Sequence, residues 1–273
     1  MLIAALFLFR TPLSRLFQSE SGLPQEQGLF PAAGSLEALR TPLPTGEIKV
    51  VPSPSPVVRE EQDSPLPTPL PLPPYRGRDP AEFRPTDAEV ASLSQEQKNK
   101  LSLDLRAYAK VVRERPDFLF EWVQIGAIKK VIGDYEGARD AWEYAGIARP
   151  GNAVSFANLG ELYSRYLKDY PRAERNFRAA LKNDPKDFQS YLSLSELYHY
   201  SYREKEDLAD DVLLEGSAAN PGNVDFFRTL ANLYKLRQEY DKAVEWWEKV
   251  LAAEPGNSAV EEEIARLKQM MRQ

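Results

Sequence analysis

Few residues in this sequence are of types that could do chemistry. The 273 residues include no Cys and a single His, which excludes thiolate nucleophiles, Cys-ligated zinc and internal disulfides. His199 stands among Tyr198, Tyr200 and Tyr202, and no second His exists to complete a metal site or a catalytic pair. We therefore expect His199 to be a partly exposed side chain without a catalytic role. Because the sequence also lacks phosphate-binding loops, G-x-S-x-G elbows, H-E-x-x-H helices and EF-hand loops, we expect neither enzymatic activity nor a cofactor.

The charged residues do not indicate a nucleic-acid partner. Lys and Arg number 35 against 41 Asp and Glu, and the basic residues form no long run. Binding to phosphate backbones by charge requires a clustered positive surface, so nucleic acid is not expected as a partner. The acidic groups at 210–211 and 261–263 are more typical of solvated helix faces or first-turn charges than of cation sites.

Proline separates the chain into two compositional parts. Sixteen of the 22 Pro residues precede position 86, whereas all four Trp and 12 of the 13 Tyr follow position 100. Because proline fixes φ and has no N–H donor, residues 18–86 are predicted to be a disordered, Pro-rich linker with polyproline II character. Pro71, Pro74 and Arg76 match the PxxPxR pattern read by SH3-type grooves, but a tract this rich in proline produces that match by chance.

Residues 1–17 form a separate apolar N-terminal segment. Its first nine residues, MLIAALFLF, would rise about 14 Å as a helix, against a hydrocarbon core of about 30 Å. The segment is interpreted as a partial transmembrane helix that begins upstream, as an interfacial anchor, or as a fortuitous apolar terminus. The first interpretation is preferred and predicts a membrane-associated protein that is otherwise cytoplasmic, with the side of the membrane left open.

Five prolines in the second part recur at a nearly constant interval. Pro116, Pro150, Pro185, Pro221 and Pro255 are separated by 34, 35, 36 and 34 residues. A period in this range is typical of a solenoid built from pairs of helices. It divides the sequence into four units, which span residues 119–152, 153–187, 188–223 and 224–257.

Aromatic and small residues recur at fixed positions within these units. Position 4 is aromatic in every unit: Trp122, Phe156, Tyr191 and Phe227. Positions 8, 20 and 27 hold small residues, with the exception of Val250: Gly126, Gly160, Ser195, Ala231, Ala138, Ala173, Ala209, Ala243, Ala145, Ala180 and Gly216. Two helices approach closely only where small residues face each other, so each unit is predicted to be an antiparallel helix pair.

This pattern resembles the tetratricopeptide repeat (TPR) family. Its signature, W-x2-L-G-x2-Y…A-x3-F…P, is matched by FANLGELY at 156–163 and by FRTLANLY at 227–234. The resemblance implies an all-α fold, a right-handed α-solenoid of about four TPR helix-turn-helix units between capping helices, after the disordered Pro-rich segment. Two departures are visible: Lys129 stands where Tyr is usual, and two extra residues at 202–205 predict an irregular turn in the third unit.

Turn and capping residues support the same division. Pro-Gly-Asn or Pro-Lys-Asp ends each unit and predicts four helix N-caps: Asn152, Asp187, Asn223 and Asn257. Residues 87–118 are predicted to be an N-terminal capping helix or half repeat, with an S-x-x-Q capping box at 94–97. Residues 258–273 are predicted to be a C-terminal capping helix with the apolar stripe Val260, Ile264, Leu267 and Met271.

The resemblance also implies a ligand groove, because TPR solenoids line their inner wall with the first helix of each pair. The residues at repeat positions 2, 5, 9, 12 and 13 should face it. The candidate groove residues are Phe120, Val123, Ala127, Lys130, Ala157, Glu161, Arg165, Gln189, Leu192, Glu196, His199, Arg228, Asn232 and Lys235. This mixed lining suits an extended or helical peptide with an apolar and a polar part, and the alternative is binding on the convex face or at an edge.

Together these features predict a non-catalytic scaffold or adaptor. Its TPR domain would be tethered to a membrane and would bind a protein or peptide partner for complex assembly. The alternative is a self-associating structural protein built from stacked solenoids, which would make the chain a homo-oligomer. An enzyme accessory domain and an RNA-binding repeat are less favoured, because the sequence shows neither a reactive group nor a basic surface.

Overall fold

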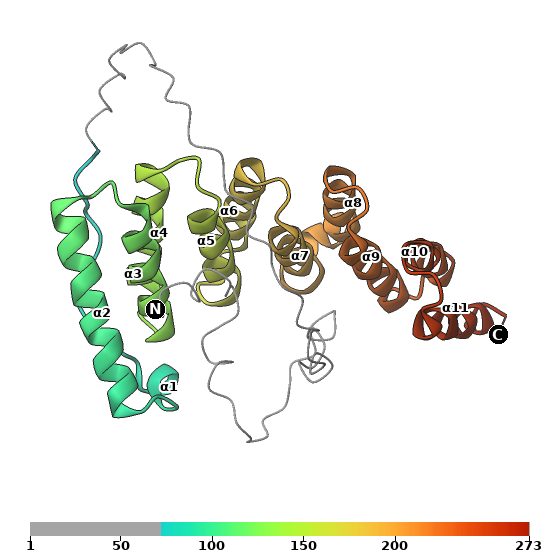
Figure 1. Cartoon of the computed structure of the whole chain (residues 1–273), viewed down its shortest axis with the longest axis horizontal. Coiled ribbons are helices and arrows are strands. Elements are labelled where there is room, and N and C mark those ends of the chain that lie inside the picture. Colours follow the sequence, from blue (N-terminus) through green and yellow to red (C-terminus); the bar gives the residue numbers. More distant parts are fainter. Residues whose placement is uncertain (1–71, 273) are drawn as a thin grey trace, which may run out of the picture. The chain divides into compact units, whose positions relative to one another are not determined.

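The computed structural model describes residues 72–272, and this range contains helices but no strand (Figure 1). The predicted apolar segment 1–17 and residues 18–71 of the predicted linker lie outside the described residues. Within 72–272, no helix is both long and apolar enough to cross a membrane. The all-α fold class is confirmed for the described part of the chain.

Each repeat unit contributes one pair of helices. The pairs are α3 (Leu119–Val131) with α4 (Tyr135–Ala148), α5 (Val154–Arg165) with α6 (Tyr170–Asn183), α7 (Phe188–Glu196) with α8 (Ala209–Ala219), and α9 (Val224–Leu236) with α10 (Tyr240–Ala253). The flanking helices are α1 (Asp87–Val90), α2 (Gln95–Glu114) and α11 (Ser258–Met270). From α2 onward every α-helix packs on the next one along the chain, which is the arrangement of a TPR-like α-solenoid (Figure 1).

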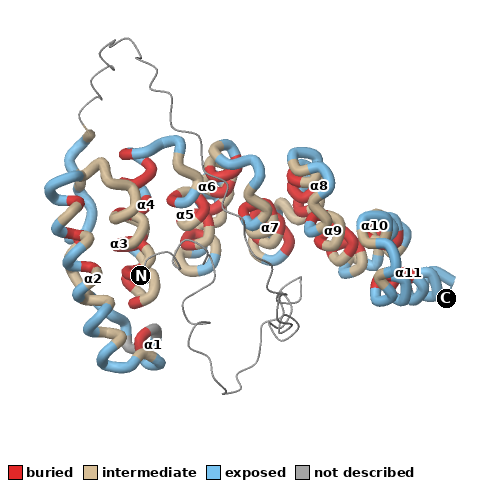
Figure 2. The backbone as a smooth tube through the Cα atoms, in the orientation of Figure 1, coloured by how far each residue is buried: buried red, intermediate tan, exposed pale blue. Residues whose placement is uncertain are grey.

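Small side chains let the helices of a pair approach. All twelve residues at positions 8, 20 and 27 are buried, and the buried faces turn toward neighbouring helices (Figure 2). A Cβ atom added at Gly160 would lie 2.5 Å from Cδ1 of Phe177, the aromatic residue at position 24 of the same unit. The close approach that the sequence predicted is confirmed, because a larger residue at this position has no room.

The third unit is irregular where its two extra residues predicted an irregular turn. α7 continues into a π-helical turn, η4 (Leu197–Ser201), which is followed by a 3-10 helix, η5 (Arg203–Leu208). A π-turn accommodates an inserted residue without breaking the helix. Despite the insertion, α7 and α8 remain in direct contact, since the Ser195 hydroxyl on α7 donates to the Ala209 carbonyl at the start of α8 at 2.7 Å.

The capping predictions are confirmed in part. Ser94 and Gln97 form the predicted capping box of α2, and the side chains of Asn223 and Asn257 cap α9 and α11. Asn152 accepts instead from the Ser155 N–H while α5 begins after Ala153, and Asp187 accepts from the Ser190 hydroxyl. Val260, Ile264 and Leu267 are buried as expected, whereas Met271 is 51% exposed because α11 ends at Met270.

Residues 72–86, which the sequence placed in the disordered linker, pack against the folded part of the chain. We call this segment the strap. It runs beside α2 (Figure 1), where Asp79 forms an ion pair with Arg113 at 2.8 Å. Leu72, Tyr75 and Phe83 contribute to the same apolar cluster as Trp122. The strap differs from the predicted linker because these apolar side chains, spaced among the prolines, find a surface to cover.

Candidate functional site

The candidate groove residues lie on α3, α5, α7, η4 and α9, and most are half-buried. Ala157 and His199 are buried, and Arg165 and Gln189 are exposed. The half-buried residues are Phe120, Val123, Ala127, Lys130, Glu161, Leu192, Glu196, Arg228, Asn232 and Lys235. Half-burial leaves these side chains accessible from one side, as a lining requires.

Ion pairs between units bring several of these residues together. Lys130 of the first unit lies 3.3 Å from Glu161 of the second, and Arg165 of the second lies 3.5 Å from Glu196 of the third. Lys235 of the fourth unit pairs with Glu263 of α11 at 2.6 Å. Arg228 turns instead to Glu254 at the end of α10. Much of the charge that the sequence assigned to the groove is therefore already neutralised within the chain.

His199 is more buried than predicted, with 7% exposure. The π-turn carries its side chain inward, where Nδ1 lies 3.5 Å from the Glu206 carboxylate. Burial lowers the pKa of His199, against the opposing effect of Glu206, so the imidazole is neutral at pH 7. Burial also raises the pKa of nearby Glu196, although Arg165 opposes this. In the third unit, burial thus shifts the pKa of both His199 and Glu196 toward the uncharged form.

A row of tyrosines at position 11 joins successive units; this position is part of the repeat signature in the sequence, but its contacts were not predicted. Tyr163 donates to Glu143 at 2.7 Å, Tyr198 to Glu174 at 2.8 Å and Tyr234 to Asp210 at 2.9 Å. In each case the carboxylate lies on the second helix of the preceding unit. Asp210 and Asp211 lie in the first turn of α8, as one of the two predicted alternatives requires, and Asp210 also pairs with Arg237 at 2.8 Å.

Glu263 differs from the prediction, because it is neither solvated nor in the first turn of α11. It is 7% exposed and contacts Lys235 and Arg266. Its neighbours Glu261 and Glu262 are exposed, as predicted. One acidic residue of the run therefore joins the last repeat to the capping helix, because it lies on the face of α11 that is turned toward α9.

Lys129 occupies position 11 in the first unit and is completely buried. Its ammonium donates to Asp134 at 2.8 Å and to the Glu82 carbonyl of the strap at 3.1 Å. Burial alone would raise the pKa of Asp134, but the hydrogen bond and charge of Lys129 hold it below its usual value. The sequence signal for this difference was Lys in place of Tyr, because position 11 of the first unit contacts the strap and not a helix of a preceding unit.

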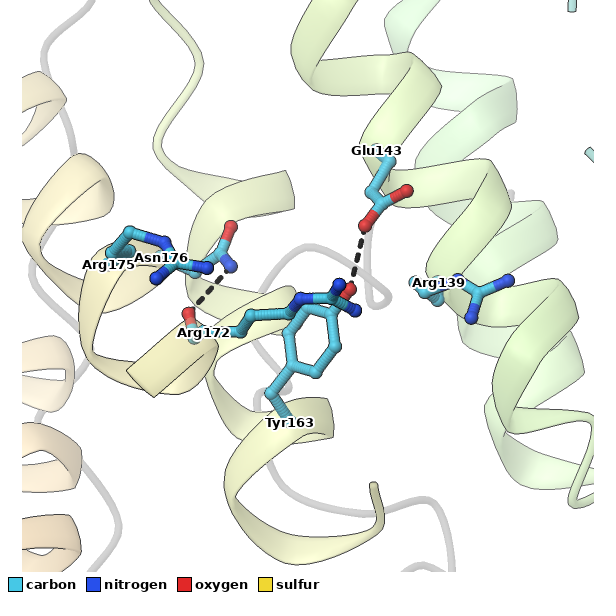
Figure 3. Close-up of a pocket in the computed structure, with 6 residues that line it drawn as sticks. All are labelled: Arg139, Glu143, Tyr163, Arg172, Arg175 and Asn176. Atoms are coloured by element: carbon cyan, nitrogen blue, oxygen red, sulfur yellow. Dashed lines mark hydrogen bonds between the residues drawn. The ribbon is translucent and has the colours of Figure 1, made fainter. Parts of the chain in front are cut away.

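A separate hollow of about 460 Å³ lies between α4, α5 and α6. Its lining is Arg139, Glu143, Tyr163, Arg172, Arg175 and Asn176 (Figure 3). The Arg172 guanidinium lies over the Tyr163 ring, and Arg139 faces it from the other side of the hollow (Figure 3). Arg139 pairs with Asp140 at 2.7 Å and Arg172 with Asp169 at 3.4 Å. These internal pairs reduce the positive charge that the hollow offers to an anion.

Among known proteins, the chain shows similarity to solved structures alone. No protein-family model and no curated protein matches the chain. The chain is similar to crystal structures of MamA (19% identity, TM-score 0.46, 61% of this chain and 97% of that one) and of YrrB, described as a TPR protein with an unusual peptide-binding site (20%, 0.44, 64% and 86%). It is also similar to TTC0263, a thermophilic TPR protein of Thermus thermophilus (16%, 0.42, 63% and 91%). The helices themselves define the class, a TPR-like α-solenoid.

Proposed function

We propose that the chain is a non-catalytic scaffold that binds a protein or peptide partner along the first helices of its TPR-like units. The proposed organisation is an N-terminal anchor at 1–17, a Pro-rich linker, an N-terminal capping part at 87–118, four units at 119–257 and a capping helix from residue 258. In this proposal the first segment tethers the scaffold to a membrane, and the groove assembles partners near its surface.

The observation that supports binding along the first helices is the chain of contacts between them. Lys130, Glu161, Arg165 and Glu196 lie on α3, α5 and α7 and pair across unit boundaries. Side chains that meet in this way share one face of the solenoid, and the half-buried apolar residues of the candidate set belong to the same helices. A face with apolar and polar parts suits a peptide better than a small polar ligand.

The test uses two residues of this face that are not in the ion pairs described above. The full chain carrying Gln189→Arg and Asn232→Arg gains two charges in the candidate groove. A control chain carrying Ala218→Arg and Ala252→Arg gains the same charge at exposed positions on α8 and α10. Native, groove and control chains are then used for affinity capture from a lysate of the source cells, after circular dichroism has shown equal helix content.

The proposal expects proteins that bind the native and control chains but not the groove variant. Partners that bind all three chains equally would contradict binding along the first helices. If none of the chains captures a protein and the mass of the native chain rises with concentration, the chain is the self-associating structural protein instead.

The proposed tether has a separate test. The full chain and a chain that begins at residue 18 are sedimented with vesicles of phosphatidylcholine and phosphatidylglycerol. The proposal expects only the full chain to sediment with the vesicles. Equal sedimentation of both chains would contradict an anchor at 1–17.

A further inference from the structure

The strap is held at the edge of the first unit by an aromatic anchor. The Tyr75 ring lies 4.7 Å from the Trp122 ring of α3 and 5.4 Å from the Tyr144 ring of α4. The Tyr144 hydroxyl donates to the Pro73 carbonyl at 2.9 Å. An extended, proline-rich backbone leaves its carbonyl groups without internal hydrogen bonds. The Tyr144 hydroxyl binds one of these carbonyls, two residues before Tyr75.

A charged anchor follows three residues later. The Arg78 guanidinium pairs with Asp134 at 2.9 Å and with Glu136, and the Arg78 N–H donates to Asp140 at 2.9 Å. Two carboxylates of the first unit therefore bind the guanidinium, whose planar donors suit them, and a third binds the backbone of the same residue. The Tyr75 hydroxyl donates to the Arg78 carbonyl at 2.8 Å, which fixes the spacing between the two anchors.

Between the anchors the backbone passes too close to α4 for a side chain. A Cβ atom added at Gly77 would lie 2.6 Å from Cβ of Asp140. The sequence Pro-Pro-Tyr-x-Gly-Arg thus makes four kinds of contact: the Pro73 carbonyl with a hydroxyl, the Tyr75 ring against two rings, a close approach at Gly77 and Arg78 with carboxylates. This is the composition of a peptide-recognition site.

Much of the strap remains accessible to solvent between its anchors. Pro73, Pro74, Arg76, Gly77, Arg78 and Asp79 are all exposed. A hollow of about 410 Å³ is lined by residues 73–77 of the strap and by α4 residues that include Ile147. Trp122 lies on α3, Tyr144 on α4 and Asp134 in the turn between them, so the residues that bind the strap belong to the first unit and not to the strap itself.

We propose that this edge of the first unit is a binding site for an extended Pro-Pro-Tyr-x-Gly-Arg segment of another protein, and that the strap is its built-in competitor. Apart from Trp122 on α3, the site is built from α4 and the turn before it, and it includes none of the candidate groove residues. Because the strap is attached to the site by a short connection, its effective concentration is about millimolar, and a partner must outcompete it.

The experiment measures binding of a fluorescent peptide with the sequence of residues 70–84 to three full-length chains. They are the native chain, a Tyr75→Ala/Arg78→Ala variant that lacks both anchors, and a Gly77→Val variant that pushes the strap away from Asp140. A control peptide carries Ala at the positions of Tyr75 and Arg78. Fluorescence anisotropy gives the dissociation constants, and circular dichroism checks that each chain is folded.

Both strap variants should bind the peptide at least tenfold more tightly than the native chain, and the control peptide should bind none of them. Adding Asp140→Ala to the Tyr75→Ala/Arg78→Ala variant should weaken its binding of the peptide again. The proposal is overturned if a folded strap variant binds the peptide no better than the native chain. It is also overturned if both strap variants lose their helices, because a displaceable occupant cannot be required for the fold.

Discussion

The first unit and the three units that follow solve one packing problem with different chemistry. In the later units a buried tyrosine hydroxyl at position 11 donates to a carboxylate of the preceding helix, as Tyr234 does to Asp210. In the first unit, the strap and not a preceding helix provides the acceptor for the position-11 side chain, and this acceptor is a backbone carbonyl. Lys129, which can donate to the Glu82 carbonyl and to Asp134 at once, takes the tyrosine's place. The residue type at position 11 therefore corresponds to the segment packed before each unit: Tyr where that segment is a helix, and Lys where it is the strap.

The largest effect is expected from removing the donor of the first unit. Lys129→Met keeps the apolar stem but leaves the buried Asp134 carboxylate with only Arg78 and the Gly137 N–H. Breaking a buried ion pair on one side costs about 3 to 5 kcal/mol, so the urea midpoint of the full chain should fall sharply.

The neighbouring lysine supplies the matched control. Lys130 pairs with Glu161 at 3.3 Å at a more accessible place, so Lys130→Met should cost at most about 1 kcal/mol. Equal losses from the two substitutions would show that the first unit does not depend on its buried pair.

The second prediction concerns position 8, where the two regions are alike. Gly126→Leu in the first unit and Gly160→Leu in the second should each cost about 3 kcal/mol, since a side chain would overlap Trp142 or Phe177. Gly151→Ala is the control, because nothing lies within 4 Å of its added Cβ. If the melting temperature of the Gly160→Leu variant equals that of the native chain, the helix pairs have been aligned in the wrong register.

The contrast also shows which features the sequence could reveal. The helix pairs follow from small residues at fixed spacing, because a buried contact between helices tolerates little else. The strap was hidden by its proline content, which predicts an extended chain and says nothing about whether its side chains find anchors. Tyr75 is the only Tyr before position 100, and it is the residue that binds the folded part. Together with the unusual Lys129, it was the available signal.

Repeat numbering predicts which helices carry the candidate groove residues, but not how the charges of those residues pair. Repeat numbering places Glu161 and Arg165 on a first helix, yet it does not tell that they pair with Lys130 and Glu196 of neighbouring units. It also missed the burial of His199, because the effect of two inserted residues depends on whether they enter the turn or, as in η4, the helix itself.

A smaller effect is expected at the position-11 tyrosines of the three later units. Tyr163→Phe, Tyr198→Phe and Tyr234→Phe each remove one hydroxyl that donates to a carboxylate, at a cost of about 1 to 1.5 kcal/mol. The sites belong to different units, so the three losses in unfolding free energy should add. A triple variant as stable as the native chain would mean that the rings, and not the hydroxyls, join the units.

The smallest effect distinguishes the third unit from its regular neighbours and depends on pH. Burial holds the pKa of His199 below its usual value of 6.5, so the unfolded chain takes up a proton at a higher pH than the folded chain does. Stability from this residue is complete above about pH 7 and falls as the pH drops through 6.5. His199→Gln should therefore lose less unfolding free energy than the native chain between pH 7.5 and pH 5.5, by roughly 1 kcal/mol or less.

The carboxylate beside His199 makes this prediction sharper. Glu206 favours the protonated imidazole, so Glu206→Gln should lower the pKa of His199 further and enlarge the loss of stability on acidification. The other titrating groups act similarly in each variant and cancel when the variants are compared. Identical pH dependence in the native chain and in His199→Gln would mean that the imidazole has the same pKa folded and unfolded, and that the π-turn does not bury it in solution.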